Sequence, residues 1–184
     1  MHIHHHWTGI APAHRGASVA LGNFDGVHLG HQRVIALAAE AAASLGIVTF
    51  EPHPREFFAP AAPAFRLMNA EARANRLAKL GVEQLYELRF DGRLAGLDAE
   101  TFAREVLAGS LGIRHLVAGA DFRFGKGRAG DVEMLRRLGP GLGFGVTVAP
   151  LICDHIGDYS STAIRGALSE GRPEDAARIL GHWP

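Results

Sequence analysis

The sequence predicts an α/β fold in which a parallel sheet carries helices on both faces, within a single domain. Short apolar runs alternate with helix-length segments along the chain, a pattern typical of parallel strands joined by helical crossovers. Glycine, asparagine, aspartate or proline stands at most of the joins, where helices begin or end. At 184 residues, the chain is long enough for one well-buried core and short for two.

Short apolar runs predict the strands, because strands of a parallel sheet are buried on both faces. The first run ends at Gly22, and the second is followed by the helix- and strand-breaking segment Glu51–Pro54. The predicted strands are, in chain order, Ala17–Leu21, Ile47–Phe50, Val82–Leu88, His115–Ala118 and Val146–Leu151. The N-terminal MHIHHHW stretch is read either as a further short edge strand that ends at Trp7 or as the remnant of a purification tag; a metal-binding cluster is the less favoured interpretation.

The helices are predicted from apolar spacing and from residues that begin or end helices. Asn69 and Asp98 are N-cap candidates, and Gly46 and Gly81 are expected to end the helices that precede them. The predicted helices are, in chain order, Leu29–Leu45, Asn69–Leu80, Asp98–Ala108, Asp131–Leu138, a helix from Ser160 or Ser161 to Glu170, and one from Pro173 to near Gly181.

Composition excludes several classes of protein. The net charge is zero, so no broad electrostatic field predicts binding to nucleic acid or to a membrane surface. No run of 18 apolar residues predicts a membrane span. The single cysteine, Cys153, cannot form an internal disulfide and favours a cytoplasmic protein. No protein partner can be read from the sequence.

The segment LGNFDGVHLGHQ places His28 and His31 in the first turn of a predicted helix. Residues three apart share one helix face, and helix N-termini favour anions, so two imidazoles there can form a phosphate cradle. Gly22, Gly26 and Gly30 are expected to let a ligand approach the backbone. The alternatives are a capping or packing pair of histidines, or a zinc site, which lacks a third ligand at suitable spacing.

The segment YSSTAIR predicts a second anion site at a helix start. Ser161 and Thr162 offer hydroxyl and amide groups, and Arg165 offers a guanidinium that can hold phosphate through two parallel hydrogen bonds. An ordinary N-cap with a surface arginine is the alternative. No Walker-type phosphate loop and no G-x-G-x-x-G dinucleotide-binding motif occurs in the chain.

Four blocks in this order, GNFDGVHLGH, FEPHPREFF, GADFRFGKGRAG and SSTAIRGALSEG, resemble the FMN adenylyltransferase module of bacterial bifunctional FAD synthetases. The resemblance runs from about Gly16 to Pro184 and implies a Rossmann-like nucleotidyltransferase fold. It implies that FMN phosphate attacks the α-phosphorus of ATP in line, which forms FAD and releases pyrophosphate. Mg²⁺ is implied with ATP, although its ligands cannot be read from the sequence.

The resemblance also implies roles for individual residues. His28, His31 and Arg165 are the expected catalytic residues. The expected ATP-binding residues are Gly22, Phe24, Gly26, His28, His31, Asp121, Ser161, Thr162 and Arg165, with Asp121 near ribose, phosphate or metal. The expected FMN-binding residues are Asn23, Pro52, His53, Pro54, Phe57 and Phe58, although core packing of the two phenylalanines is an equal alternative. Asp25 is read either as part of the site or as a residue that fixes the glycine loop by accepting backbone N–H bonds.

The family usually continues into a riboflavin kinase barrel, which is expected to be absent from residues 1–184. An excised module, a truncated reading frame and a free-standing adenylyltransferase are all compatible with the sequence. Two alternative functions are a nucleotidyltransferase with another acceptor, such as pantetheine phosphate or nicotinate mononucleotide, and a catalytically silent flavin- or nucleotide-binding module.

Overall fold

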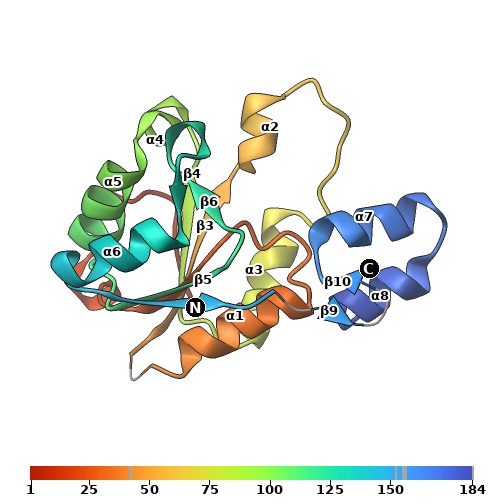
Figure 1. Cartoon of the computed structure of the whole chain (residues 1–184), viewed down its shortest axis with the longest axis horizontal. Helices are drawn as coiled ribbons and strands as arrows, with labels where there is room; N and C mark the ends of the chain where they lie inside the picture. The colour runs from red at the N-terminus through yellow and green to blue at the C-terminus, as the bar shows by residue number, and fades with distance from the viewer. Residues whose placement is uncertain (42, 152, 155–156, 184) are drawn as a thin grey trace.

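A six-stranded parallel sheet forms the centre of the computed structural model, which describes residues 1–41, 43–151, 153–154 and 157–183 (Figure 1). The strands follow the order β1-β4-β3-β2-β5-β8, and every neighbouring pair is parallel. Their bounds are β1 His2–His4, β2 Ser18–Leu21, β3 Leu45–Glu51, β4 Gln84–Arg89, β5 His115–Gly119 and β8 Gly145–Ala149. The predicted parallel α/β sheet is therefore confirmed.

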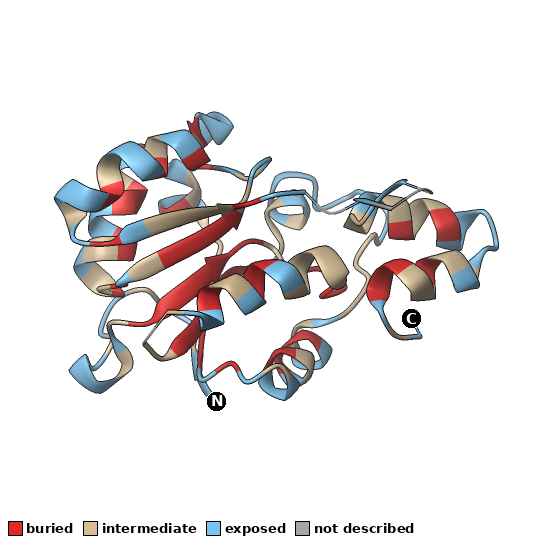
Figure 2. Cartoon of the chain, turned by 60° about the horizontal axis from the view of Figure 1, so that its bottom comes forward, coloured by how far each residue is buried: buried red, intermediate tan, exposed pale blue. Residues whose placement is uncertain are grey.

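Two helical layers cover the sheet, one on each face. α1 (Leu29–Ala39) and α3 (Ala70–Lys79) cover one face, where they pack on a core that contains Ile47. α5 (Ala99–Thr101), the π-helix η2 (Phe102–Ser110) and α6 (Val132–Leu142) cover the other, where Val48 is buried. Adjacent residues of β3 thus serve opposite cores, and Figure 2 shows the buried residues concentrated in the sheet and on the helix sides that face it.

A helical hairpin lies beside the sheet (Figure 1). It consists of α7 (Ser161–Ser169) and α8 (Pro173–Leu180), which pack on each other around a small core of their own that includes Ile164 and Ala176. Leu67, in the long segment between α2 (Pro54–Phe58) and α3, packs against this core. The start of α7 is held at the edge of the sheet by contacts described below.

Several short elements were not expected from the sequence, because each is too short to show a hydrophobic period. They are η1 Pro12–His14, α2 Pro54–Phe58, α4 Gly92–Gly96, η3 Lys126–Arg128, the hairpin of β6 Arg123–Phe124 with β7 Gly130–Asp131, and the hairpin of β9 Cys153–Asp154 with β10 Gly157–Asp158. Local polar caps define some of them: His53 and Glu56 form a capping box at the start of α2.

The predicted end of the first helix is wrong. α1 ends at Ala39, and Leu45 and Gly46 belong to β3 instead of the helix. Gly46 is required by strand packing, because a Cβ atom there would lie 2.9 Å from the side chain of Val19. Ala42, which falls within that predicted helix, and Pro184, the predicted end of the domain, lie outside the described residues.

Other boundaries moved less. The N-terminal edge strand is confirmed as β1, which pairs with β4 and ends three residues before Trp7. Asp131 is the N-cap of α6, which continues past the predicted end at Leu138 to Leu142. Among the described residues, no helix is both long and apolar enough to cross a membrane.

Candidate active site

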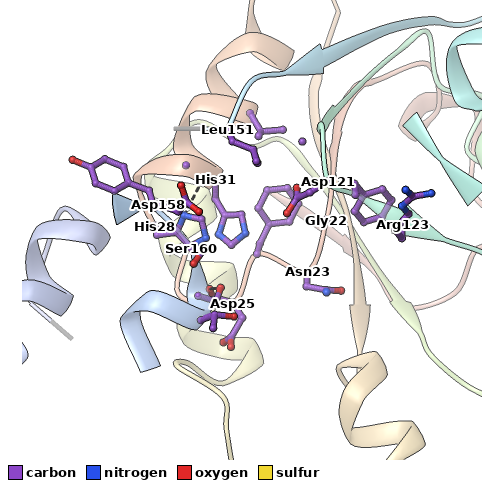
Figure 3. Close-up of a pocket in the computed structure, with 18 of the residues that line it drawn as sticks. Gly22, Asn23, Asp25, His28, His31, Asp121, Arg123, Leu151, Asp158 and Ser160 are labelled. Atoms are coloured by element: carbon purple, nitrogen blue, oxygen red, sulfur yellow. Dashed lines mark hydrogen bonds between the residues drawn. The ribbon is translucent and has the colours of Figure 1, made fainter. Parts of the chain in front are cut away.

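A pocket of about 450 Å³ opens at the carboxyl ends of β2 and β5. Strands β3 and β4 continue the sheet on one side of this pair and β8 on the other, so the pocket lies where the strand order reverses. Ligands of open α/β sheets bind at such points. The pocket is lined by the loop after β2, the first turn of α1, the loop after β5 and the start of α7 (Figure 3).

His28 and His31 lie together on the pocket wall at the N-terminus of α1 (Figure 3). His28 is the N-cap residue, and its Nδ1 accepts a hydrogen bond from the backbone N–H of His31 at 3.3 Å. The two rings stack with centroids 3.6 Å apart, and Phe24 packs against His31 at 5.0 Å. His28 is therefore both a cap and a pocket residue, so the two interpretations of the pair are compatible.

Burial keeps both imidazoles neutral. Desolvation lowers the pKa of His28 to about 4; the carboxylate of Asp25 opposes this shift, and Arg165 adds to it. Burial, together with the neighbouring His28, lowers the pKa of His31 well below its usual value of 6.5. Because Nδ1 of neutral His28 is an acceptor, its proton resides on Nε2, where it is available as a donor. Among the described residues, no side chain or backbone group pairs with the buried Nδ1 of His31.

The loop between β2 and α1 has a strained backbone. Phe24 and Val27 have positive φ values of 52° and 43°, and Gly26 has 87°. Left-handed backbone at residues other than glycine costs about 1–3 kcal/mol each and persists only where surrounding contacts hold it. Gly26 does not line the pocket, and a Cβ atom on it would lie 2.8 Å from Leu67.

Gly30 lines the pocket, and it also serves the packing of two segments. A Cβ atom on Gly30 would lie 2.9 Å from the carbonyl oxygen of Tyr159 and 3.0 Å from the ring of His28. The absent side chain thus lets the segment before α7 approach the first turn of α1. Gly22, which lines the pocket, would bring a Cβ only to 3.4 Å from the Phe24 ring.

The N-terminus of α7 forms a second wall of the same pocket. Ser160 is the N-cap and accepts a hydrogen bond from the N–H of Ala163 at 3.1 Å, which settles the start of this helix. The hydroxyl of Ser161 donates to the carbonyl oxygen of Asp25 at 2.8 Å. Ser161 and Thr162 both line the pocket, so the structure brings the SSTAIR block next to the histidine pair.

Arg165 is bound to Asp25 in this structure. Its Nη2 lies 2.6 Å from Asp25 Oδ2, and its Nε donates to the carbonyl oxygen of Phe65 at 2.7 Å. Asp25 is 2% exposed, and its Oδ1 accepts the backbone N–H bonds of Leu67 and Met68. Asp25 thus lines the pocket and also fixes the glycine loop by accepting backbone N–H bonds, which come from the 65–68 segment. Through Arg165 it joins this segment to α7.

The expected FMN-binding residues are distributed over two places. Asn23 and His53 line the pocket. Pro52 and Pro54 flank His53 just outside it, and α2 carries Phe57 and Phe58 beyond them, 36% and 68% exposed, with Phe58 5.8 Å from the ring of Phe90. Core packing does not account for Phe58, because more than half of its side chain faces solvent.

Asp121 and Asp158 are carboxylates of the pocket lining, and Asp121 lies on the loop after β5 (Figure 3). Among the described residues, no group of three or more histidine, cysteine, aspartate or glutamate side chains is arranged to hold a metal ion. A cation in this pocket would therefore need ligands from a bound substrate as well as from the chain.

The sequence did not indicate the aromatic and cationic stack beside the pocket. The guanidinium groups of Arg55 and Arg165 lie 4.6 and 5.0 Å from the centre of the Phe65 ring, and the ring of His53 packs edge to face with it at 4.9 Å. Arg123 and Arg128 also line the pocket. The two arginines fall in the GADFRFGKGRAG block, so that motif could have indicated them, whereas Phe65 lies in a segment without any motif.

A model of the family described as FAD synthetase matches residues 10–163. The chain belongs to the FAD synthetase family. The match spans the five strands from β2 to β8 of the sheet and the start of α7, including His28, His31 and Ser161, whereas β1 and Arg165 lie outside it.

Curated members of the FAD synthetase family are similar over most of the chain. A bifunctional riboflavin kinase/FMN adenylyltransferase of Pseudomonas fluorescens is 40% identical over 176 residues, which cover 94% of this chain and 56% of the relative. A FAD synthetase of Listeria monocytogenes is 36% identical over 91% of this chain and 70% of that relative. A putative bifunctional riboflavin kinase/FMN adenylyltransferase of Geobacillus thermodenitrificans is 37% identical over 92% of this chain and 91% of that relative. The chain thus spans a little over half the length of the first of these relatives.

Solved structures agree with the family's fold. A Streptococcus pneumoniae structure described as a macrolide-efflux protein superposes with a TM-score of 0.85 at 29% identity. The superposition covers 98% of this chain and 61% of the other chain. Pantothenate synthetase of Thermus thermophilus shares the fold, with a TM-score of 0.56 at 16% identity. The superposition covers 98% of this chain and 81% of the synthetase chain.

Proposed function

We propose that the chain transfers the adenylyl group of ATP to the phosphate of FMN, which forms FAD and pyrophosphate. One observation carries the proposal: the N-termini of α1 and α7 open into one pocket, with two neutral histidines at one and Ser161, Thr162 and Arg165 at the other. Two helix N-termini suit a ligand with several phosphate groups. The names of the curated relatives supply the acceptor, FMN.

In this proposal, an oxygen of FMN phosphate attacks the α-phosphorus of ATP, and the bond from that phosphorus to the pyrophosphate oxygen breaks. Negative charge builds up on the oxygens around phosphorus during the step. The Nε2–H of His28 and the ring of His31 lie at the helix end where such charge is best stabilised. Neutral donors suit this task, because they need no counter-charge while the pocket is empty.

Ser161, Thr162 and Arg165 are proposed to hold the β- and γ-phosphates, with Gly22, Phe24 and Asp121 on the nucleotide side of the pocket and Gly26 supporting the loop from outside. A guanidinium carries five N–H donors, so Arg165 can bind a phosphate through other N–H groups while its Nε contacts Phe65 and its Nη2 contacts Asp25. The ion pair with Asp25 is then proposed to orient Arg165 toward the triphosphate.

FMN is proposed to lie on the β3 side of the pocket, with its phosphate near Asn23 and His53 and its ring system extending past Pro52 and Pro54 toward α2. The exposed Phe58 and its neighbour Phe57 are then available to contact the isoalloxazine. Replacing Phe58 by serine tests this assignment, because an exposed side chain adds little stability. A higher KM for FMN with an unchanged KM for ATP is expected; an unchanged KM for FMN would remove Phe58 from the site.

Mg²⁺ is proposed to enter with ATP. The residues present fit this role, because Mg²⁺ commonly keeps several waters and binds one or two carboxylates together with substrate phosphates. Asp121 and Asp158 are the pocket carboxylates that could supply such ligands. When bound, the ion would neutralise phosphate charge.

The test is to incubate the purified chain with FMN, ATP and Mg²⁺ and to measure FAD and pyrophosphate by chromatography. Formation of both in equal amounts is expected, and binding of FMN and ATP without turnover would favour a silent binding module. Pantetheine phosphate and nicotinate mononucleotide serve as alternative acceptors. With riboflavin in place of FMN we expect no FMN, since the phosphate-binding groups found in the described residues belong to one pocket. The lone cysteine further supports the proposal that the protein is cytoplasmic.

A further inference from the structure

Arg73 is a charged side chain in the middle of the molecule, outside the pocket. It belongs to α3 and is the largest of the side chains that are fully buried, with 0% of its surface exposed. Burying a guanidinium is costly unless carboxylates and hydrogen bonds compensate for the lost water, and apolar residues of similar size often serve stability as well or better. Stability alone therefore does not account for an arginine at this position.

The contacts of Arg73 reach two neighbouring strands and one residue that lines the pocket. Its Nη2 lies 2.8 Å from Oε2 of Glu51, the last residue of β3, and 2.8 Å from Oε2 of Glu87 in β4. Its Nη1 donates to the carbonyl oxygen of Asn23, a pocket residue, at 3.4 Å. One guanidinium thus connects α3, two strands and the loop that leads from β2 to His28.

The charges around Arg73 are compensated within the cluster. Arg66 binds both oxygens of Glu51 at 2.7 and 3.0 Å. Desolvation would raise the pKa of Glu51, but Arg66 and Arg73 together outweigh it, so this pKa is lowered. Glu87 is also 3.5 Å from His5. Because its charge is matched by these carboxylates, Arg73 acts on the pocket mainly through the position of the Asn23 carbonyl.

A second, independent hydrogen bond reaches the same carbonyl. The hydroxyl of Thr49, a fully buried residue of β3, donates to the oxygen of Asn23 at 3.1 Å. The Asn23 carbonyl therefore has two buried donors from two different elements. It immediately precedes the left-handed Phe24, where the strained path toward Val27 and His28 begins.

We propose that Arg73 is a positioning residue for the adenylyl transfer, and that it acts with Thr49 by fixing the Asn23 carbonyl so that the strained loop presents His28 and His31 to the α-phosphate. This inference rests on the proposed function. Arg73 and Thr49 touch no substrate in this account. Their effect is transmitted along the backbone from residue 23 to residue 28.

Two substitutions test the proposal. Thr49→Val keeps nearly the same shape and removes only the hydroxyl, whereas Arg73→Lys keeps the charge but cannot reach two carboxylates and the carbonyl with one ammonium group. We expect kcat for FAD formation to fall about 3- to 10-fold in Thr49→Val and further in Arg73→Lys, with KM for ATP and FMN changed less than twofold. The double variant should lose less than the product of the two single losses, because both contacts hold one carbonyl.

Hydrogen exchange gives a readout that does not depend on catalysis. The backbone amides of residues 23–28 should exchange several-fold faster in both variants. Val106→Ala is the matched control, because Val106 is fully buried in the core on the opposite face of the sheet. At a comparable loss of melting temperature, it should leave kcat and the exchange of residues 23–28 unchanged.

The outcomes separate the two claims. If the wild-type chain makes no FAD, the proposed function fails, and faster exchange in Thr49→Val would still show that Thr49 and Arg73 position the loop. If the wild type is active and Thr49→Val retains both wild-type kcat and wild-type exchange, the positioning role is overturned. Should Arg73→Lys fail to fold, Thr49→Val alone decides.

Discussion

The guanidinium of Arg165 lies 2.6 Å from the carboxylate of Asp25, and this ion pair joins α7 to the loop that follows β2. Asp25 is almost completely buried, whereas a quarter of the Arg165 side chain is exposed. The carboxylate therefore depends on Arg165 for its charge compensation more than Arg165 depends on it. A ligand that moved Arg165 away from Asp25 would leave a buried carboxylate without its cation, which costs free energy.

Replacing Arg165 by alanine should weaken ATP binding more than FMN binding, because Arg165 is assigned to the β- and γ-phosphates. Arg165→Lys should restore ATP binding only in part, since a point charge cannot reproduce two parallel hydrogen bonds. Titration calorimetry with each ligand measures the difference. Equal losses of affinity for ATP and FMN would show that Arg165 acts only through Asp25.

Asp25→Asn should lower the melting temperature, because an amide NH₂ cannot accept the hydrogen bond of Arg165 Nη2. The amide oxygen can still accept the N–H bonds of Leu67 and Met68. Asp25→Asn combined with Arg165→Met should cost less stability than the sum of the two single variants. Additive losses would mean that the ion pair contributes no coupling.

His28→Ala or His31→Ala should lower kcat/KM by roughly 10²-fold, the scale of losing one preorganised donor at a transition state. The melting temperature should fall by only a few degrees in His28→Ala, the scale of losing one N-cap in a chain of this size. His6→Ala, an exposed histidine near the N-terminus, is the control and should keep full activity. Wild-type turnover in both pocket variants would refute the cradle.

Stability should fall as the pH is lowered from 7 to 5. The pKa of His28 is about 4 in the folded chain and 6.5 in its ordinary environment, so the unfolded chain binds more protons within this window. The contribution of His28 is therefore fully present above pH 6.5 and is lost as the pH falls toward 4. Melting temperatures measured at several pH values should show a shallower slope in His28→Asn, while His6→Ala should keep the wild-type slope.

Gly30→Ala should reduce activity, because its methyl group would meet the Tyr159 carbonyl at 2.9 Å and the His28 ring at 3.0 Å. Either the start of α7 or the histidine must then move. Gly92→Ala is the matched control, since a Cβ atom there would meet nothing within 4 Å. Steady-state kinetics of the two variants make the comparison, and equal activities would show that the approach of the two helix starts is not needed.

The sequence was sufficient to predict the sheet and the location of the pocket, because both depend on local signals. Apolar runs are long enough to identify strands, and glycine- and histidine-rich blocks follow them directly. The mistaken end of α1 has a tertiary cause: the leucine and glycine at 45–46 suit a helix end as well as a strand start. Only the pairing of Gly46 with β2 and β4 in the folded chain decides in favour of the strand start.

The contacts that shape the pocket were less predictable. Asp25 meets Arg165 across 140 residues of sequence, and Phe65, in a segment with no recognisable motif, packs against two arginines from other segments. Such pairs result from the packing of whole elements and leave no local signature. The packing role of Gly30 was not predictable for the same reason, because its neighbour Tyr159 is distant in sequence.

The two helix starts that are proposed to bind phosphate rest on different hydrophobic cores, one between α1 and the sheet and one inside the α7–α8 hairpin. The hairpin is held to the rest of the fold by contacts with Asp25, by the 65–67 segment, and by Gln32 of α1, whose amide donates to the carbonyl oxygen of Leu180. The α7–α8 hairpin is consequently a unit that can be exchanged between relatives. The hairpin of a relative should replace this one if its arginine and serine contact Asp25 and its last carbonyl contacts Gln32. Substitutions in α8 could then change the spacing of the two helix starts without altering any residue that faces the ligand.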